Sequence, residues 1–187
     1  MMRRQQSDPI LRPSTASPGR RRTAGFPVWK TVTLGTHESV RSLREALNAA
    51  GFGIGDLARE ALNRLALTAR PRTPLDLAVV SGSKLGLTAE DTSLAEICSR
   101  AAAHGLMLCP AEVAPQLRLQ YPDQPPGEFL RIAMAPIATN RGDVGFVVGN
   151  GGLGLLLIGA DGRPHRVVSP MVRFVFVHPG ETAASRN

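Results

Sequence analysis

The segment from residue 112 to 128, EVAPQLRLQYPDQPPGE, concentrates side chains that can bind a polar ligand. Polar and apolar residues alternate from Gln116 onward, so the pattern predicts an extended segment with Arg118 and Gln120 on one face. Arginine, glutamine and tyrosine side chains placed together bind carboxylate, phosphate or peptide groups. We therefore predict that residues 112–128 form a contact surface. The candidate binding residues are Glu112, Gln116, Arg118, Gln120 and Tyr121.

The same residues leave two other interpretations open. The segment is also consistent with an ordered loop whose side chains hydrogen bond within the protein and which leads into a sheet. In addition, Glu112, Arg118 and Tyr121 are of the types that a small hydrolase or transferase uses, although no spacing rule fixes how far apart they lie. The sequence therefore favours a non-enzymatic protein and leaves an enzyme as the alternative.

Cys109 is the candidate nucleophile for that enzymatic alternative. It precedes Pro110, which suits the first position of a short helix, and a thiol at a helix N-terminus can have a lowered pKa. Any of His37, His104 or His178 could serve as its base, and the spacing selects none of them. The alternative is that Cys109 is a small buried hydrophobic residue after the apolar residues 106–108.

Other motifs with a chemical meaning are absent from the sequence or are better explained structurally. The run from Gly149 to Gly154, GNGGLG, has the glycine spacing of a dinucleotide-binding loop, but a strand-like run follows it where that loop requires a helix. Asn150-Gly151 between two apolar runs instead predicts a β-hairpin. The four histidines are scattered and there is no C-x-x-C or H-E-x-x-H pattern, so we predict no metal site and no cofactor.

The charge of the chain is distributed unevenly. The formal net charge of the 187 residues is +7, yet residues 1–25 hold six arginines and one acidic residue, or +5. This proline-containing tail cannot bury enough apolar surface to order itself, and we predict it to be disordered. A nucleic-acid-associated function through an arginine arm is one alternative; a targeting peptide or an over-extended start are others. The arm's candidate nucleic-acid contacts are Arg3, Arg4, Arg20, Arg21 and Arg22.

Hydrophobic periodicity predicts the elements that must position these side chains. Apolar residues recur at helical spacing over residues 38–50, 55–66 and 93–105, and Ser93 with Glu96 forms a capping box. Alternating or continuous apolar runs predict a series of strands instead. The expected fold is α+β, with a mostly antiparallel sheet and about three helices packed on one face, in a single domain over residues 26–180 followed by a flexible C-terminus at 181–187. The predicted strands are Phe26–Leu34, Asp76–Ser81, Phe129–Ala135, Val144–Gly149, Leu153–Gly159, Pro164–Ser169 and Val172–His178.

Several short strings resemble a family of short bacterial proteins of uncharacterised function. They are WKTVTLGT at 29–36, LCPAEV at 108–113, PQLRLQY at 115–121 and DQP at 123–125. The resemblance covers about residues 28–140 and a closing FVFV, and it implies a bacterial cytoplasmic setting. The two cysteines make no disulfide framework, which agrees with a reducing compartment. We expect a non-enzymatic binding protein whose partner is a protein or a small anionic ligand, with no membrane association.

Overall fold

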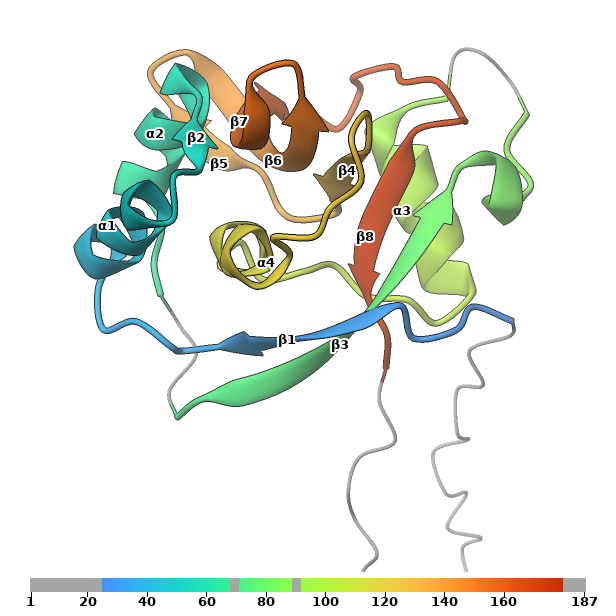
Figure 1. The fold of residues 1–187 in the computed structure, drawn as a ribbon. Helices are drawn as coiled ribbons and strands as arrows, with labels where there is room; N and C mark the ends of the chain where they lie inside the picture. Colours follow the sequence, from blue (N-terminus) through green and yellow to red (C-terminus); the bar gives the residue numbers. More distant parts are fainter. Residues whose placement is uncertain (1–24, 68–70, 89–91, 180–187) are drawn as a thin grey trace, which may run out of the picture.

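A curled eight-stranded sheet organises the molecule, and the computed structural model describes it over residues 25–67, 71–88 and 92–179. In the order β1-β3-β8-β4-β6-β7-β2 each strand pairs with the next, and β5 pairs with β6. Helices lie within and against the curl (Figure 1). The elements are β1 (Lys30–Leu34), α1 (Val40–Ala49), β2 (Gly53–Ile54), α2 (Asp56–Asn63), β3 (Thr73–Ser81), the short 3-10 helix η1 (Ser83–Leu85), α3 (Leu94–Ala103), α4 (Val113–Gln120), β4 (Phe129–Ile132), β5 (Ile137–Thr139), β6 (Gly142–Gly151), β7 (Gly154–Asp161) and β8 (Arg173–Val177).

The α+β class is confirmed, but the sheet is mixed. β4 runs parallel to β8, with Leu130 opposite Arg173, and β2 runs parallel to β7. The prediction of a mostly antiparallel sheet is wrong on this point because β8 returns from the end of the chain and inserts between β3 and β4. Two neighbouring parallel strands must be joined by a crossover connection. No local sequence pattern marks the connection from β4 to β8 or the one from β2 to β7.

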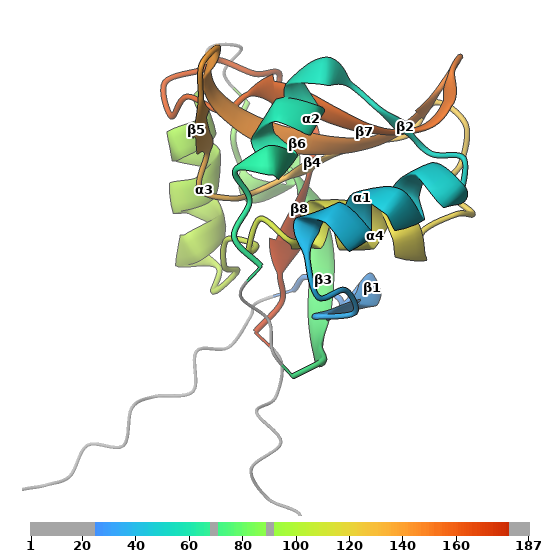
Figure 2. The same ribbon diagram turned by 90° about the vertical axis from the view of Figure 1, so that its left-hand side faces the viewer.

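The helices occupy both faces of the sheet, whereas the sequence predicted about three helices on one face. α3 packs on one face, against Phe174 and Phe176 of β8. α1, α2 and α4 lie on the other, concave face, where Val175 and Val177 of the same strand join their core. The two groups are separated by the sheet in both views (Figures 1 and 2). The alternation of β8 residues therefore divides the molecule into two apolar clusters, both of them buried.

Local signals place the helix ends. The Ser39 hydroxyl accepts a hydrogen bond from the backbone N–H of Ser42, and the Ser42 hydroxyl accepts one from the backbone N–H of Ser39, so α1 starts with a capping box. The Ser93 hydroxyl accepts from the backbone N–H of Glu96 and caps α3, which is one of the two hydrogen bonds of the predicted capping box. The helices predicted over residues 38–50, 55–66 and 93–105 are confirmed, with slightly shorter bounds.

The glycine-rich motif lies in a hairpin, as predicted, but the turn is two residues later than expected. β6 and β7 pair from Val144 with Asp161 to Gly151 with Gly154, so the turn is at residues 152–153. Asn150 stays in the strand because its Nδ2 donates to the Gln124 carbonyl at 2.7 Å. The predicted strand at 164–169 does not form, and among the described residues the pairing there is an isolated bridge from Val167 to Ser93.

Candidate functional site

The polar segment singled out in the sequence forms a buried helix rather than an extended segment. α4 lies inside the curl of the sheet, and Glu112, Gln116 and Arg118 are 1%, 0% and 0% exposed. Arg118 and Gln120 are two residues apart on a helix, so they point in different directions and do not share a face. The prediction of an extended conformation is therefore wrong.

The side chains of Gln120 and Glu112 hydrogen bond to the backbone at the β1 edge of the sheet. Gln120 Oε1 accepts from the backbone N–H of Thr33 at 2.9 Å, and its Nε2 donates to the Thr33 carbonyl at 2.9 Å. Glu112 Oε1 accepts from the Gly35 backbone N–H at 2.8 Å and from Gln116 Nε2 at 3.2 Å. An edge strand leaves such backbone groups unpaired. The side chains of α4 thus take the place of a neighbouring strand beside β1.

Arg118 joins the turn after α4 to the hairpin. Its Nη1 donates to Gln124 Oε1 at 2.5 Å and to the Gly149 carbonyl at 3.2 Å, and its Nη2 donates to the Tyr121 carbonyl. The guanidinium also lies 5.0 Å from the centre of the Phe52 ring. Burial lowers the pKa of Arg118 to about 10, which leaves it charged at neutral pH.

The five predicted binding residues are therefore brought together, and most of their polar groups hydrogen bond within the protein; Glu112 Oε2 and Arg118 Nε are buried without a partner in the described part of the chain. Tyr121 is also buried, and its hydroxyl donates to Glu128 at 2.9 Å. Glu112 and Tyr121 lie at opposite ends of α4, about 13 Å apart along the helix axis at 1.5 Å per residue, so they do not form one catalytic group. Direct contact of these residues with a partner stays a prediction. The alternative of a segment that hydrogen bonds within the protein agrees with the contacts, although residues 113–120 form a helix and not a loop.

Cys109 lies in the core, four residues before α4 begins. It is 4% exposed, and its Sγ donates to the Val175 carbonyl at 3.4 Å. Burial raises the pKa of its thiol above the ordinary range, which disfavours the nucleophilic thiolate. Among the described residues, no histidine hydrogen bonds to Cys109. This environment matches the interpretation of Cys109 as a buried hydrophobic residue.

The two cysteines are expected to differ in reactivity. Cys98 lies half-buried on α3, whereas Cys109 is enclosed, and burial raises the pKa of both thiols. In native protein at neutral pH, iodoacetamide should therefore modify Cys98 first, while Cys109 reacts only as fast as the protein unfolds. Peptide mapping by mass spectrometry after timed labelling measures both rates. Fast modification of Cys109, with an inflection near pH 7, would restore it as a candidate nucleophile.

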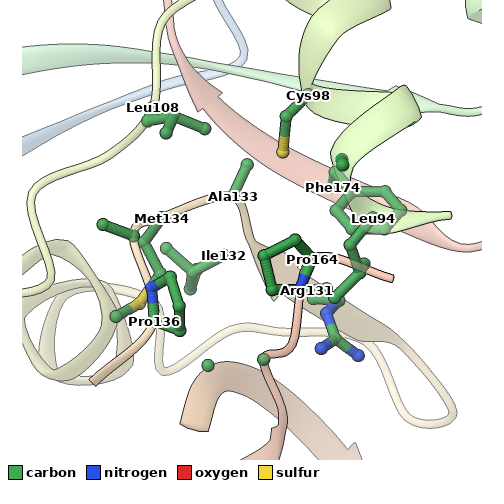
Figure 3. A pocket seen from close by; sticks show the side chains of 14 residues that line it. Leu94, Cys98, Leu108, Arg131, Ile132, Ala133, Met134, Pro136, Pro164 and Phe174 are labelled. Atoms are coloured by element: carbon green, nitrogen blue, oxygen red, sulfur yellow. The ribbon is translucent and has the colours of Figure 1, made fainter. Parts of the chain in front are cut away.

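The structure shows a pocket that the sequence did not suggest. A cavity of about 300 Å³ lies between α3 and the end of β4, where the chain leaves the sheet. Leu94 and Cys98 of α3, Phe174 of β8 and residues 132–136 line it, and nearly all of these side chains are apolar (Figure 3). Apolar cavities with a few polar groups are the usual form of small-molecule sites. This cavity is the strongest candidate site in the described residues.

Arg131 is the charged residue of this pocket. It comes from β4, and Figure 3 shows it beside Pro164 and Leu94, across the pocket from Leu108 and Met134. Within the described residues its guanidinium makes one hydrogen bond, from Nη2 to the Asp161 backbone carbonyl, and no salt bridge. A guanidinium carries five N–H donors. Most of the donors of Arg131 are therefore free to bind an acceptor.

The charge of Arg131 shares its main counter-charge with other arginines. Asp161 favours the charged form of Arg131, and the neighbouring Arg166 disfavours it to a smaller extent. The Asp161 carboxylate is already bound by Arg163, with Nη2 and Oδ2 2.6 Å apart, and those hydrogen bonds hold the pKa of Asp161 below its usual range. Burial lowers the pKa of Arg131, which means that its charge is held in a partly dehydrated place. Such a cation favours an anion in the pocket.

Comparison with known proteins adds no assignment. No family model, no curated protein and no solved structure matches the chain. Among the described residues no group of three or more histidine, cysteine, aspartate or glutamate side chains could hold a metal ion, and no helix there has the length and apolarity to cross a bilayer. The predicted arginine arm lies outside the described residues, and its contact with nucleic acid stays a prediction.

Proposed function

We propose that the protein is a non-catalytic binding protein for a small apolar molecule that carries a carboxylate or a similar anion. The observation that supports this proposal is the Arg131 guanidinium, which has one backbone hydrogen bond at the wall of an otherwise apolar cavity. The apolar part of the ligand would pack against residues 132–136 and Phe174. Its anionic group would accept the free donors of Arg131, which fit a carboxylate in a bidentate manner.

Two glycines, Gly145 and Gly162, line the pocket beside Arg131. Gly145 lies under the guanidinium, and a Cβ there would come 3.9 Å from Arg131 Nη2. Gly162 touches the backbone of Gly145, since a Cβ on Gly162 would lie 2.7 Å from the Gly145 nitrogen. The absence of a side chain at Gly162 thus lets the chain after β7 approach β6 closely beside Arg131, whereas a Cβ at Gly145 would be at ordinary contact distance.

Hexanoate binding tests the proposal. Hexanoate should bind the full-length protein, and Arg131→Met should weaken it about tenfold to a hundredfold, because one charge-assisted interaction contributes about 1.5–3 kcal/mol. Isothermal titration calorimetry measures the affinity, and slower alkylation of Cys98 with bound hexanoate reports the location. Hexanol lacks the charge and should bind wild type and Arg131→Met equally, which also shows that the variant is folded.

Arg100→Met is the matched control, because Arg100 is exposed on α3 and does not line the cavity. It should leave hexanoate affinity unchanged. Equal affinity of wild type for hexanoate and hexanol, or hexanoate binding that leaves Cys98 labelling unaffected, would contradict the proposal.

A further inference from the structure

A second apolar cavity adjoins the pocket of Arg131. It has a volume of about 400 Å³ and lies at the C-terminal end of α3, over Phe176 and Pro179. Cys98 and Leu108 line both cavities, so the two share a wall. Among the described residues, the lining of the second cavity contains no charged side chain.

Exposed apolar side chains border the shared wall. Met107 is 50% exposed and Leu108 is 46% exposed, although the backbone of Met107 is fixed by two hydrogen bonds with Val177. Large apolar side chains that are held at the rim of a cavity mark a surface that contacts something apolar. Cys98 and Leu108 thus lie between the pocket of Arg131 and the second apolar cavity.

We propose that both cavities take one ligand, and that this ligand is a linear alkyl carboxylate whose chain passes Cys98 and Leu108 into the second cavity. The proposal rests on the proposed function, because it uses the same Arg131 site for the carboxylate. Charge complementarity fixes the orientation: Arg131 is the charged group in the lining of the two cavities, and it stands at one end. A compact acid would fill the first cavity and leave the second empty, whereas an unbranched chain uses the apolar surface of both.

The affinities of a series of acids from butanoate to dodecanoate test the length of the site. Each methylene that enters an apolar cavity should tighten binding by up to about fourfold, as expected from about 0.8 kcal/mol per buried CH₂. Affinity in wild type should therefore keep rising past hexanoate, measured by calorimetry below the concentrations at which the longer acids self-associate. If the affinity stops rising at hexanoate and Arg131→Met still weakens hexanoate binding, the inference of one ligand in both cavities is overturned. The proposed function is then left intact.

Two variants separate the second cavity from the first. Ala102 and Met107 line only the second cavity and are exposed, so Ala102→Trp and Met107→Asp should fold normally. Both should weaken dodecanoate at least tenfold and leave hexanoate unchanged. Ala103→Trp, at an exposed position on the same helix outside both cavities, should change neither.

The remaining outcomes are also decisive. If dodecanoate binds tightly and neither Ala102→Trp nor Met107→Asp weakens it, its alkyl chain lies outside the second cavity and the inference is overturned. Dimerisation that Met107→Asp abolishes, with no gain for longer acids, would assign the second cavity to a second copy of the chain. If no acid binds at all, the proposed function fails, and the inference fails with it.

Discussion

Replacing Arg118 with alanine is expected to destabilise the protein by about 4 kcal/mol. The change removes three hydrogen bonds from a charged group and leaves the carbonyls of Tyr121 and Gly149 and the Gln124 side chain without those donors in a buried place. Hydrogen bonds to charged groups contribute about 1.5–3 kcal/mol each, and an unsatisfied buried group costs about 1–3 kcal/mol. Part of this loss is offset, because the buried charge that burial disfavours is also removed.

Urea unfolding followed by circular dichroism measures this effect. Arg118→Met separates the loss of hydrogen bonds from the loss of side-chain volume, since methionine refills much of that volume but offers no donors. It should remain strongly destabilised if the hydrogen bonds dominate. Arg100→Ala, at an exposed position of α3, should leave the unfolding midpoint essentially unchanged.

The same variant decides between the two interpretations of residues 112–128. If Arg118→Ala keeps the unfolding midpoint of wild type but loses a partner that wild type retains in a pull-down, the segment is a contact surface and Arg118 does not stabilise the fold. Loss of stability with no specific loss of a partner supports the internal role.

Replacing Gly159 with alanine is expected to cost about 3 kcal/mol by forcing α2 away from β7. A Cβ at this position would lie 2.6 Å from the Ala58 nitrogen and 2.7 Å from the Leu57 carbonyl carbon. Both atoms belong to the backbone, so no side-chain rotation can relieve the clash. Overpacking in a core typically costs about 1–3 kcal/mol, and the upper end applies because a helix must move. For a chain of this size the melting temperature should fall by about 10 °C.

Gly145→Ala is the matched control for this prediction. Gly145 is likewise a glycine of the β6–β7 pair, but the nearest atoms to a Cβ there are 3.8 Å and 3.9 Å away, an ordinary contact distance. Thermal unfolding followed by circular dichroism should show Gly145→Ala close to wild type. Equal destabilisation by both substitutions would indicate that glycine matters in this sheet for a reason other than the approach of α2.

The elements with local signals were predictable from the sequence. Capping serines at Ser39 and Ser93 and apolar stripes at helical spacing defined α1 and α3. The hairpin followed from Asn150-Gly151 between two apolar runs, although the contact of Asn150 with Gln124 shifted its turn. In each case the decisive interactions lie within a few residues of one another along the chain.

The conformation of α4 could not be predicted because the elements that surround it are distant in the sequence. A helix normally shows its period through one apolar and one polar face. α4 contacts α1, β1, β6 and β7, so it has no solvent face, and its polar residues sit where other elements expose backbone groups. The QLRLQ pattern of residues 116–120 therefore alternates like a strand. Gln120 reaches Thr33 across 87 residues, a pairing that no local pattern encodes.

The pocket could not be predicted for a related reason. Its wall combines Leu94, Leu108, Arg131 and Phe174, which come from four separate parts of the chain. Arg131 was visible only as a charged residue within a predicted strand. Its candidate role depends on the small number of hydrogen bonds that its guanidinium makes. That number follows from the positions of Asp161 and Gly145 in the folded protein.

The position of β8 has a consequence for the order in which the protein can assemble. Residues 173–177 follow every other described strand in the chain, yet they form the strand that joins the β1-β3 pair to the strands that begin with β4. Until that strand emerges, β3 and β4 each carry an unpaired edge, a known hazard for association with other chains. The complete sheet therefore cannot form during translation before residues 173–177 have been made, whereas the pairs β1-β3 and β6-β7 need no later segment.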